Sequence, residues 1–259
     1  MRQFRTLWFA AVAATLVLAA CGSSSKDNAS TNSSGKLSGT ATVLAASSLT
    51  KGFTRLGEEF QAAHPGTKIE FSFGSSSDLE KSIVEGAPAD VFASADQQSM
   101  TNLVSADENS GAPANFAKNR LEIAVERGNP EHIATLSDLA KNGVKAVLCD
   151  PSAPCGKFAA QVLGNADVEV TPVSLEPSAT ATLSKVELGE ADAAVVYISD
   201  VVASGKVDGV KIPDDVNILT TLPIVALRDS KNAALAEAWV DYVVAHQSEL
   251  VSKYGFLPL

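Results

Sequence analysis

Two serines, Ser48 and Ser76, stand where an apolar strand pattern gives way to a helical pattern. The first apolar run ends at Ser47-Ser48, and apolar residues then recur at helical spacing. In the second copy a strand-like alternation ends at Gly74, and three serines follow it. The start of a helix offers unpaired N–H groups and the positive end of a dipole, and a hydroxyl there adds another donor. The repeated arrangement predicts a receptor for an oxyanion.

A serine before a helix has a simpler interpretation, because it is an N-cap more often than a ligand contact. Ser77 and Glu80 have the spacing of a capping box, so we expect the second helix to begin at Ser77 and that serine to act only as a cap. For Ser48 and Ser76 the capping role remains the alternative, and the pairing of the two motifs favours the ligand role.

The first residues have the features of an export signal. Arg2 and Arg5 precede a continuous apolar run over Leu7 to Ala20, which is short for a membrane span and ends at Cys21. This ending resembles the lipobox of bacterial lipoproteins, which implies a signal peptide over 1–20 and a lipidated Cys21. An ordinary secretion signal is the alternative. Residues 21–39 have almost no apolar side chains and predict a flexible tether.

Composition limits the partners. The chain has 259 residues, of which 46% are hydrophobic, so it can bury a large core as one domain or two. Its formal net charge is −10, and removal of Arg2 and Arg5 makes it −12, which argues against nucleic acid. No other segment is apolar and long enough to span a bilayer, so a lipid on Cys21 would be the membrane anchor.

The two remaining cysteines, Cys149 and Cys155, would lie outside the reducing cytoplasm, and we expect them to form a structural disulfide. Free thiols are the alternative. Metal or redox chemistry is less well supported, because a metal site needs more ligands and the spacing is not C-x-x-C.

Strand and helix patterns alternate from Thr40 onward, which predicts an α/β fold with largely parallel sheets. Strands are expected at 121–125, 193–197 and 223–227, and Ser178 is expected to precede a helix. We assign lobe I to residues 40–119 with 223–259, and lobe II to residues 120–222. Ligands collect outside the carboxyl ends of strands in such folds, so we expect a cleft between the lobes.

The run from Ala45 to Asp96 resembles the periplasmic molybdate-binding proteins of ABC importers, above all in AASSL, GSSS and GAPADVFASAD. The resemblance continues through CDPSAPCGKFA, VELGEADAAVVYISD and the closing KYGF, and it extends from Thr40 to Phe256. It implies a two-lobed type II periplasmic binding protein fold, with a ligand cleft between lobes joined by hinge strands.

The resemblance also implies a set of ligand-binding residues. Ser48 and Ser76 would supply hydroxyl and N–H donors, and Tyr197 would supply a hydroxyl. Cys155 and Ala179 would donate their main-chain N–H groups, although PSAT around Ala179 departs from the family pattern. The oxyanion would be held through its oxygens, with no direct metal ligand and no cofactor.

The function implied is that of an extracytoplasmic solute-binding lipoprotein on the outer face of the cytoplasmic membrane. It would capture molybdate or tungstate as a monomer and deliver it to an ABC permease. A binding protein for another tetrahedral oxyanion, such as sulfate, is the alternative.

Other functions find less support in the residues. The serines lack a G-x-S-x-G elbow, because Asp78 stands where the last glycine is needed, and there is no P-loop or H-E-x-x-H motif, so we expect no enzyme. A ferric site needs a tyrosine cluster or histidine, and only three tyrosines are present. Asp90 and Asp96 are expected to be structural hydrogen-bonding groups.

Overall fold

The computed structural model of the protein describes residues 36–259. The predicted signal peptide, Cys21 and most of the predicted tether lie outside the described residues, so these interpretations stay predictions. Within residues 36–259 we find no helix with the length and apolar character needed to cross a membrane. The strands are β1 (Gly39–Ala46), β2 (Thr67–Gly74), β3 (Val91–Ala93), β4 (Asn109–Glu126), β5 (Ala146–Cys149), β6 (Ser174–Glu176), β7 (Ala193–Tyr197), β8 (Val207–Lys211) and β9 (Leu219–Leu227). The α-helices are α1 (Thr50–Ala63), α2 (Ser76–Val84), α3 (Gln97–Ser105), α4 (Pro154–Asn165), α5 (Ala179–Glu187), α6 (Ile198–Ser204), α7 (Ala233–Ala245) and α8 (Gln247–Tyr254), and the 3-10 helices are η1 (Ser47–Leu49) and η2 (Leu136–Ala140).

The strands form a mixed sheet in the order β2-β1-β3-β9-β4-β7-β5-β6, with β8 paired to β4. β1 pairs in parallel with β2 and β3, and β5 pairs in parallel with β6 and β7. All pairings of β4 and β9 are antiparallel, so the expectation of largely parallel sheets is wrong for these two strands. The reason is their path: β4 leads from one lobe to the other and β9 leads back beside it.

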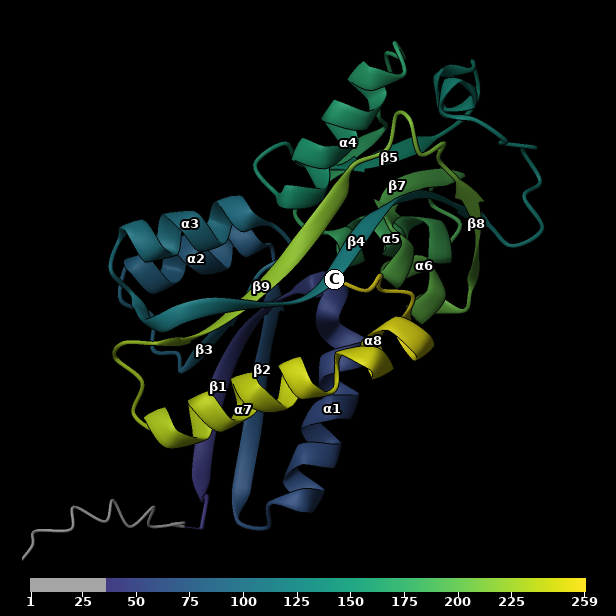
Figure 1. Ribbon diagram of the computed structural model, residues 1–259. Coiled ribbons are helices and arrows are strands. Elements are labelled where there is room, and N and C mark those ends of the chain that lie inside the picture. Colours follow the sequence, from purple (N-terminus) through teal and green to yellow (C-terminus); the bar gives the residue numbers. More distant parts are fainter. Residues whose placement is uncertain (1–35) are drawn as a thin grey trace, which may run out of the picture. The chain divides into compact units, whose positions relative to one another are not determined.

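Strand β4 belongs to both lobes. Its first part, as far as Arg120, pairs with β9, and its second part, from Leu121, pairs with β7 and β8. Figure 1 shows β4 and β9 running together between α1, α2, α3 and α7 on one side and α4, α5 and α6 on the other. This is the predicted arrangement of two lobes joined by strands. The residue limits of lobe I and lobe II stay predictions, and we use the names for the ranges given above.

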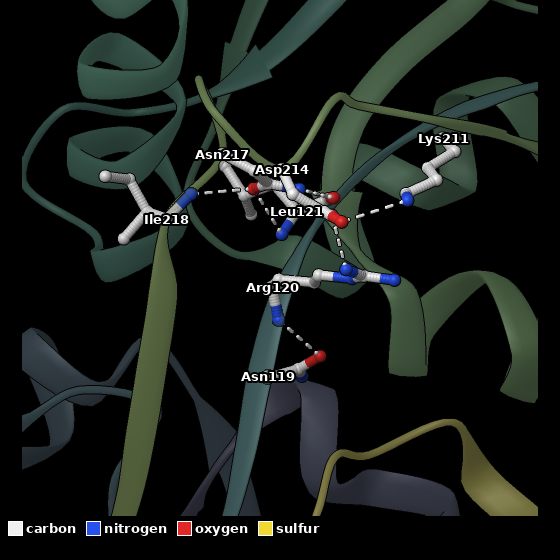
Figure 2. A network of polar contacts seen from close by, with 7 residues as sticks. All are labelled: Asn119, Arg120, Leu121, Lys211, Asp214, Asn217 and Ile218. Atoms are coloured by element: carbon white, nitrogen blue, oxygen red, sulfur yellow. Dashed lines mark hydrogen bonds and ion pairs between the residues drawn. The ribbon is translucent and has the colours of Figure 1, made fainter.

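A polar network ties β4 to the segment before β9 (Figure 2). The side chain of Asn217 accepts the N–H of Leu121 at 3.2 Å and donates to the carbonyl oxygen of Leu121 at 2.8 Å. The neighbouring Arg120 pairs with Asp214 at 2.7 Å. Leu121 is the residue of β4 that lies opposite Tyr197 in β7. The network therefore fixes the part of β4 on which the end of β7 rests.

The apolar face of α1 anchors the helix in the core of lobe I. Phe53, Leu56 and Phe60 are buried there. Trp239 of α7 meets the rings of Phe53 and Phe60 edge-on, with centroids 5.8 and 5.6 Å apart, a favourable geometry for aromatic pairs. Packing of this kind fixes the start of α1, and with it the turn that carries Ser48.

Candidate functional site

A small cavity lies where strand ends and helix starts from both lobes meet. The centre of a water molecule can occupy about 10 Å³ of this cavity, so it has room for one water molecule or one compact ion. The five residues predicted to hold a ligand all line this cavity: Ser48, Ser76, Cys155, Ala179 and Tyr197. That they bind an anion stays a prediction. The other lining residues are Ala46, Ser47, Gly74, Ser75, Ala95, Ala153, Pro154 and Ser178.

Ser48 reaches the cavity from the turn between β1 and α1. The chain leaves β1 at Ala46 and passes through η1, in which Ser47, Ser48 and Leu49 are buried. The hydroxyl of Ser48 has no hydrogen-bond partner among residues 36–259. A buried hydroxyl in this state has lost its bond to water, so a ligand that accepts hydrogen bonds would satisfy it.

The three consecutive serines after β2 have three different environments. Helix α2 begins at Ser76, one residue earlier than predicted, and Ser75 occupies the N-cap position. The hydroxyl of Ser76 accepts the N–H of Ala95 at 3.0 Å. The hydroxyl of Ser77 donates to the carbonyl oxygen of Ser152 at 2.8 Å. The prediction that Ser77 serves only as a helix cap is therefore wrong, because its hydroxyl donates a hydrogen bond to a main-chain carbonyl of lobe II.

Sequence reasoning missed Ser75 and Ala95 as cavity residues, although both belong to motifs that it singled out. Ala95 lies two residues after the last residue of β3, so the sequence signal for it is a position just beyond the carboxyl end of a strand. For Ser75 the sequence offers no such signal, because three adjacent serines give no local sign of which one contacts a ligand.

Lobe II lines the cavity with the loop between β5 and α4. The predicted disulfide between Cys149 and Cys155 is present and closes this loop. The carboxylate of Asp150 accepts the N–H and the hydroxyl of Ser152 at 2.8 and 2.6 Å, and these bonds lower the pKa of Asp150. Gly156 lies so close to the Asp150 carbonyl that a Cβ would sit 2.0 Å from its oxygen. The loop therefore has little freedom to change its shape.

The start of α5 forms another part of the lobe II wall. Ser178 precedes the helix as predicted, and its hydroxyl accepts the N–H of Ala181 at 3.3 Å. Ala179 is the first residue of the helix and is buried against the cavity. First-turn N–H groups have no partner within their own helix, which is the property that a main-chain donor to a ligand needs.

Tyr197 closes the cavity from the end of β7, the strand predicted at these residues. Its side chain is 1% exposed, and its hydroxyl has no partner among the described residues. Burial raises the pKa of Tyr197 well above its usual value, and the charges of Asp96 and Asp200 raise it further. The hydroxyl therefore keeps its proton and is able to donate a hydrogen bond.

Asp200 lies behind Tyr197 in the first turn of α6. It is 5% exposed and accepts the backbone N–H of Tyr197 at 3.1 Å. Burial raises the pKa of Asp200 to about 7, although the bond from Tyr197 acts in the opposite direction. The main-chain N–H of Tyr197 is thus hydrogen-bonded to a carboxyl that titrates near neutral pH.

Asp90 and Asp96 have the structural roles that the sequence predicted. Asp90 accepts the N–H of Thr42 at 2.7 Å and the hydroxyl of Ser230 at 2.6 Å. Asp96 caps α3 by accepting the N–H of Ser99 at 2.9 Å. Neither carboxylate lines the cavity.

No residue that lines the cavity has a charged side chain. Its polar atoms are hydroxyls and main-chain groups, which suit a ligand that accepts hydrogen bonds. Over residues 36–259 we also find no group of three or more His, Cys, Asp or Glu that could hold a metal ion.

The two lobes touch each other beside the cavity. On one side Ser77 donates to Ser152, as described above. On another side the hydroxyl of Thr180 donates to the carbonyl oxygen of Ser47 at 3.2 Å, and the N–H of Thr180 reaches the Ser47 hydroxyl at 3.5 Å. Ser47 lines the cavity, and Ser77, Ser152 and Thr180 are sequence neighbours of lining residues, so the contacts hold the cavity walls together.

Comparison with known proteins defines the family. The family of bacterial extracellular solute-binding proteins matches residues 41–257. The chain belongs to this family. The molybdate-binding protein ModA of Mycobacterium tuberculosis is 38% identical to this solute-binding protein over 239 residues, which are 90% of each chain. The protein is thus a component of solute transport and not an enzyme, as the sequence predicted.

Solved structures show the same fold. The periplasmic molybdate-binding protein of Azotobacter vinelandii aligns with a TM-score of 0.73 at 21% identity, over 85% of this chain and 99% of that one. The sulfate-binding protein SubI of Mycobacterium tuberculosis aligns with a TM-score of 0.74 at 18% identity, over 85% and 87%. The periplasmic binding protein fold predicted for this solute-binding protein is therefore confirmed.

Proposed function

We propose that this solute-binding protein captures molybdate, and also tungstate, outside the cytoplasm and delivers it to the membrane subunits of an ABC permease. The observation that carries the proposal is that residues from both lobes, among them Ser48 and Tyr197, line one small cavity with buried hydroxyls that have no partner among the described residues. The molybdate-binding function of the relative from Mycobacterium tuberculosis supports the same ligand.

The donors suit the charge state of the ligand. Molybdate and tungstate are fully deprotonated tetrahedral dianions near neutral pH, so they offer only hydrogen-bond acceptors. A cavity lined by neutral donors complements such an ion, and a carboxylate among them would repel it. Phosphate keeps a proton under these conditions and needs an acceptor for it, which disfavours phosphate.

Sulfate is the closest competitor, because it has the same charge and shape but shorter bonds to its oxygens. A site that fits the larger ion leaves some acceptors of sulfate imperfectly paired. Each unpaired buried group costs about 1–3 kcal/mol, so a few of them produce a large preference.

We assign the ligand contacts as the resemblance implied. Ser48 and Ser76 donate from their hydroxyl and N–H groups, and Tyr197 donates from its hydroxyl. Cys155 and Ala179 donate their main-chain N–H groups. The anion is held through its oxygens, and the protein makes no bond to the metal.

The acidic surface of the protein is compatible with an anionic ligand. The formal net charge of the chain is −10. The Debye length is about 8 Å at physiological ionic strength, so carboxylates on the distant surface have little effect inside the cavity. The hydrogen-bond donors that line the cavity therefore determine the affinity for the anion.

We further propose that Cys21 is lipidated and that residues 21–39 tether the folded part to the outer face of the cytoplasmic membrane. Two acyl chains on one cysteine give the stable anchoring that a single chain does not. The protein would act as a monomer, with lobe I and lobe II closing on the ion before it docks on the permease.

The test is isothermal titration of the purified protein with molybdate, sulfate and phosphate at equal ionic strength. We expect tight one-to-one binding of molybdate and weak binding of sulfate and phosphate. Ser48→Ala should weaken molybdate binding, whereas Ser82→Ala, whose hydroxyl bonds to Leu79 outside the cavity, should not. Equal binding of sulfate and molybdate would mean a general oxyanion receptor, and binding of none of the three ions would refute the proposal.

A further inference from the structure

Ser75 occupies the N-cap position of α2 but does not cap the helix. An N-cap serine normally accepts a hydrogen bond from an N–H of the first turn through its side chain. The side chain of Ser75 makes no such bond, and the N–H of Asp78, which a capping side chain could accept, bonds to the carbonyl oxygen of Ser75. The hydroxyl is thus not needed for the start of the helix.

The Ser75 hydroxyl is buried without a partner. The residue is 7% exposed, and its Oγ has no hydrogen-bond partner among residues 36–259. Two other hydroxyls in this state, those of Ser48 and Tyr197, line the same cavity as Ser75. Since buried polar groups in folded proteins are nearly always paired, three such hydroxyls around one cavity indicate that a bound group pairs them.

The neighbours of Ser75 do not share this property. The hydroxyl of Ser76 already accepts a hydrogen bond from the N–H of Ala95, and the hydroxyl of Ser77 donates one to the carbonyl oxygen of Ser152 in lobe II. Of the three serines, Ser75 is therefore the one whose hydroxyl is wholly free to serve a ligand.

We propose that Ser75 is a further ligand-binding residue, whose hydroxyl donates a hydrogen bond to the oxyanion beside those of Ser48 and Tyr197. The inference rests on the proposed function and adds a donor to its site. A tetrahedral oxyanion has four oxygens that each accept more than one bond, so a third hydroxyl does not displace the others. Hydrogen bonds to charged groups are among the strong ones, so this donor contributes to the affinity and to the preference for a fully deprotonated ion.

The experiment compares the full chain with its Ser75→Ala variant by titration with molybdate. We expect the Kd to rise about ten- to a hundredfold, the range for loss of one hydrogen bond to a charged group. The melting temperature without molybdate should stay the same, because the hydroxyl makes no bond in the free protein. Ser75→Gly, which removes the hydroxyl and keeps a residue suited to an N-cap, should weaken binding similarly.

Ser82→Ala is the matched control, because Ser82 lies in the same helix and bonds to the carbonyl oxygen of Leu79. It should bind molybdate like the wild type. A Ser75→Ala variant with wild-type affinity, or one that loses only thermal stability, would overturn the inference and leave the proposed function intact. A wild-type protein that binds neither molybdate nor sulfate would overturn both.

Discussion

Both lobes present helix starts to the cavity, but lobe II adds a disulfide-closed loop and a tyrosine whose main-chain N–H bonds to a buried carboxylate. The serines of lobe I follow β1 and β2, two strands paired in parallel along their whole length, and α1 packs into an aromatic core. The lobe II donors depend on two further devices, the bond between Cys149 and Cys155 and the carboxyl of Asp200. The lobe I half of the cavity thus depends on packing, strand pairing and the hydrogen bond between Ser76 and Ala95, whereas the lobe II half depends also on a covalent bond and on a carboxyl whose protonation changes with pH.

The difference matters because the two halves must meet around one ion. Tyr197 is connected to lobe I through β4, where Leu121 lies opposite it. The side chain of Asn217 bonds to both the N–H and the carbonyl oxygen of Leu121. We therefore expect a change at the end of β7 to affect β4, one of the strands that join the lobes.

The largest effect is expected for Asp200→Asn, measured as the free energy of unfolding against pH without ligand. The pKa of Asp200 is about 7 in the folded protein, against an ordinary value of 3.8. A raised pKa means that the folded state holds the proton more tightly, so this stabilisation is complete below pH 3.8 and is lost as pH rises through about 7. The loss amounts to about 4 kcal/mol for a shift of this size.

Asparagine keeps an oxygen for the N–H of Tyr197 but does not ionise, so the variant should gain stability relative to the wild type as pH rises over this window. Urea titrations at several pH values would give the difference curve. A constant difference between the two proteins from acid to neutral pH would contradict the role given to Asp200 and remove the pH sensitivity from lobe II.

Tyr197→Phe should have the next largest effect, now on affinity. The change removes only a hydroxyl that has no partner in the free protein, so the melting temperature without ligand should not fall. The Kd for molybdate should rise about ten- to a hundredfold. Tyr242→Phe is the matched control, because Tyr242 packs against Trp239 and does not line the cavity. This variant should bind molybdate with the wild-type affinity. Unchanged binding by Tyr197→Phe would mean that lobe II contributes only main-chain donors.

Replacement of both Cys149 and Cys155 by serine should destabilise the protein by about 2 kcal/mol, the value of the loop-entropy model for so short a loop. For a chain of this size that corresponds to a melting temperature lower by roughly 4–8 °C. Calorimetry would measure the shift. A reductant should lower the melting temperature of the wild type by the same amount and leave the variant unchanged. If the reductant also lowered the melting temperature of the variant, loss of the disulfide would not explain the effect of the reductant on the wild type.

The sequence predicted the local part of this architecture well. The strand ends and helix starts at Ser48, Ser178 and Tyr197 follow from runs of apolar residues and turn residues that a short segment contains in full. The disulfide also followed from the cysteine count and the expected compartment. These features depend on neighbours in the chain.

The features that the sequence did not predict depend on distant partners. The first part of β4 contains Gly111, Pro113 and several polar residues, so it lacks a strand pattern, and it is a strand because β9 pairs with it across two register shifts. The direction of that pairing also made the sheet less parallel than expected. Ser77 was assigned from a local capping motif, whereas its partner, Ser152, lies 75 residues away in the chain.

That contact provides the smallest and most specific prediction, for Ser77→Ala. The bond between the Ser77 hydroxyl and the Ser152 carbonyl joins the two lobes. If the lobes open as proposed, this bond breaks, so the loss of the hydroxyl should destabilise the closed state and leave the open state unchanged. A single neutral hydrogen bond contributes about 0.5–1.5 kcal/mol, so the Kd for molybdate should rise between two- and about tenfold. The effect should appear in a faster dissociation rate in stopped-flow measurements, with the association rate unchanged, because encounter takes place with the open form. A slower association rate would show that Ser77 shapes lobe I itself, and that the two halves of the cavity close without help from this bond.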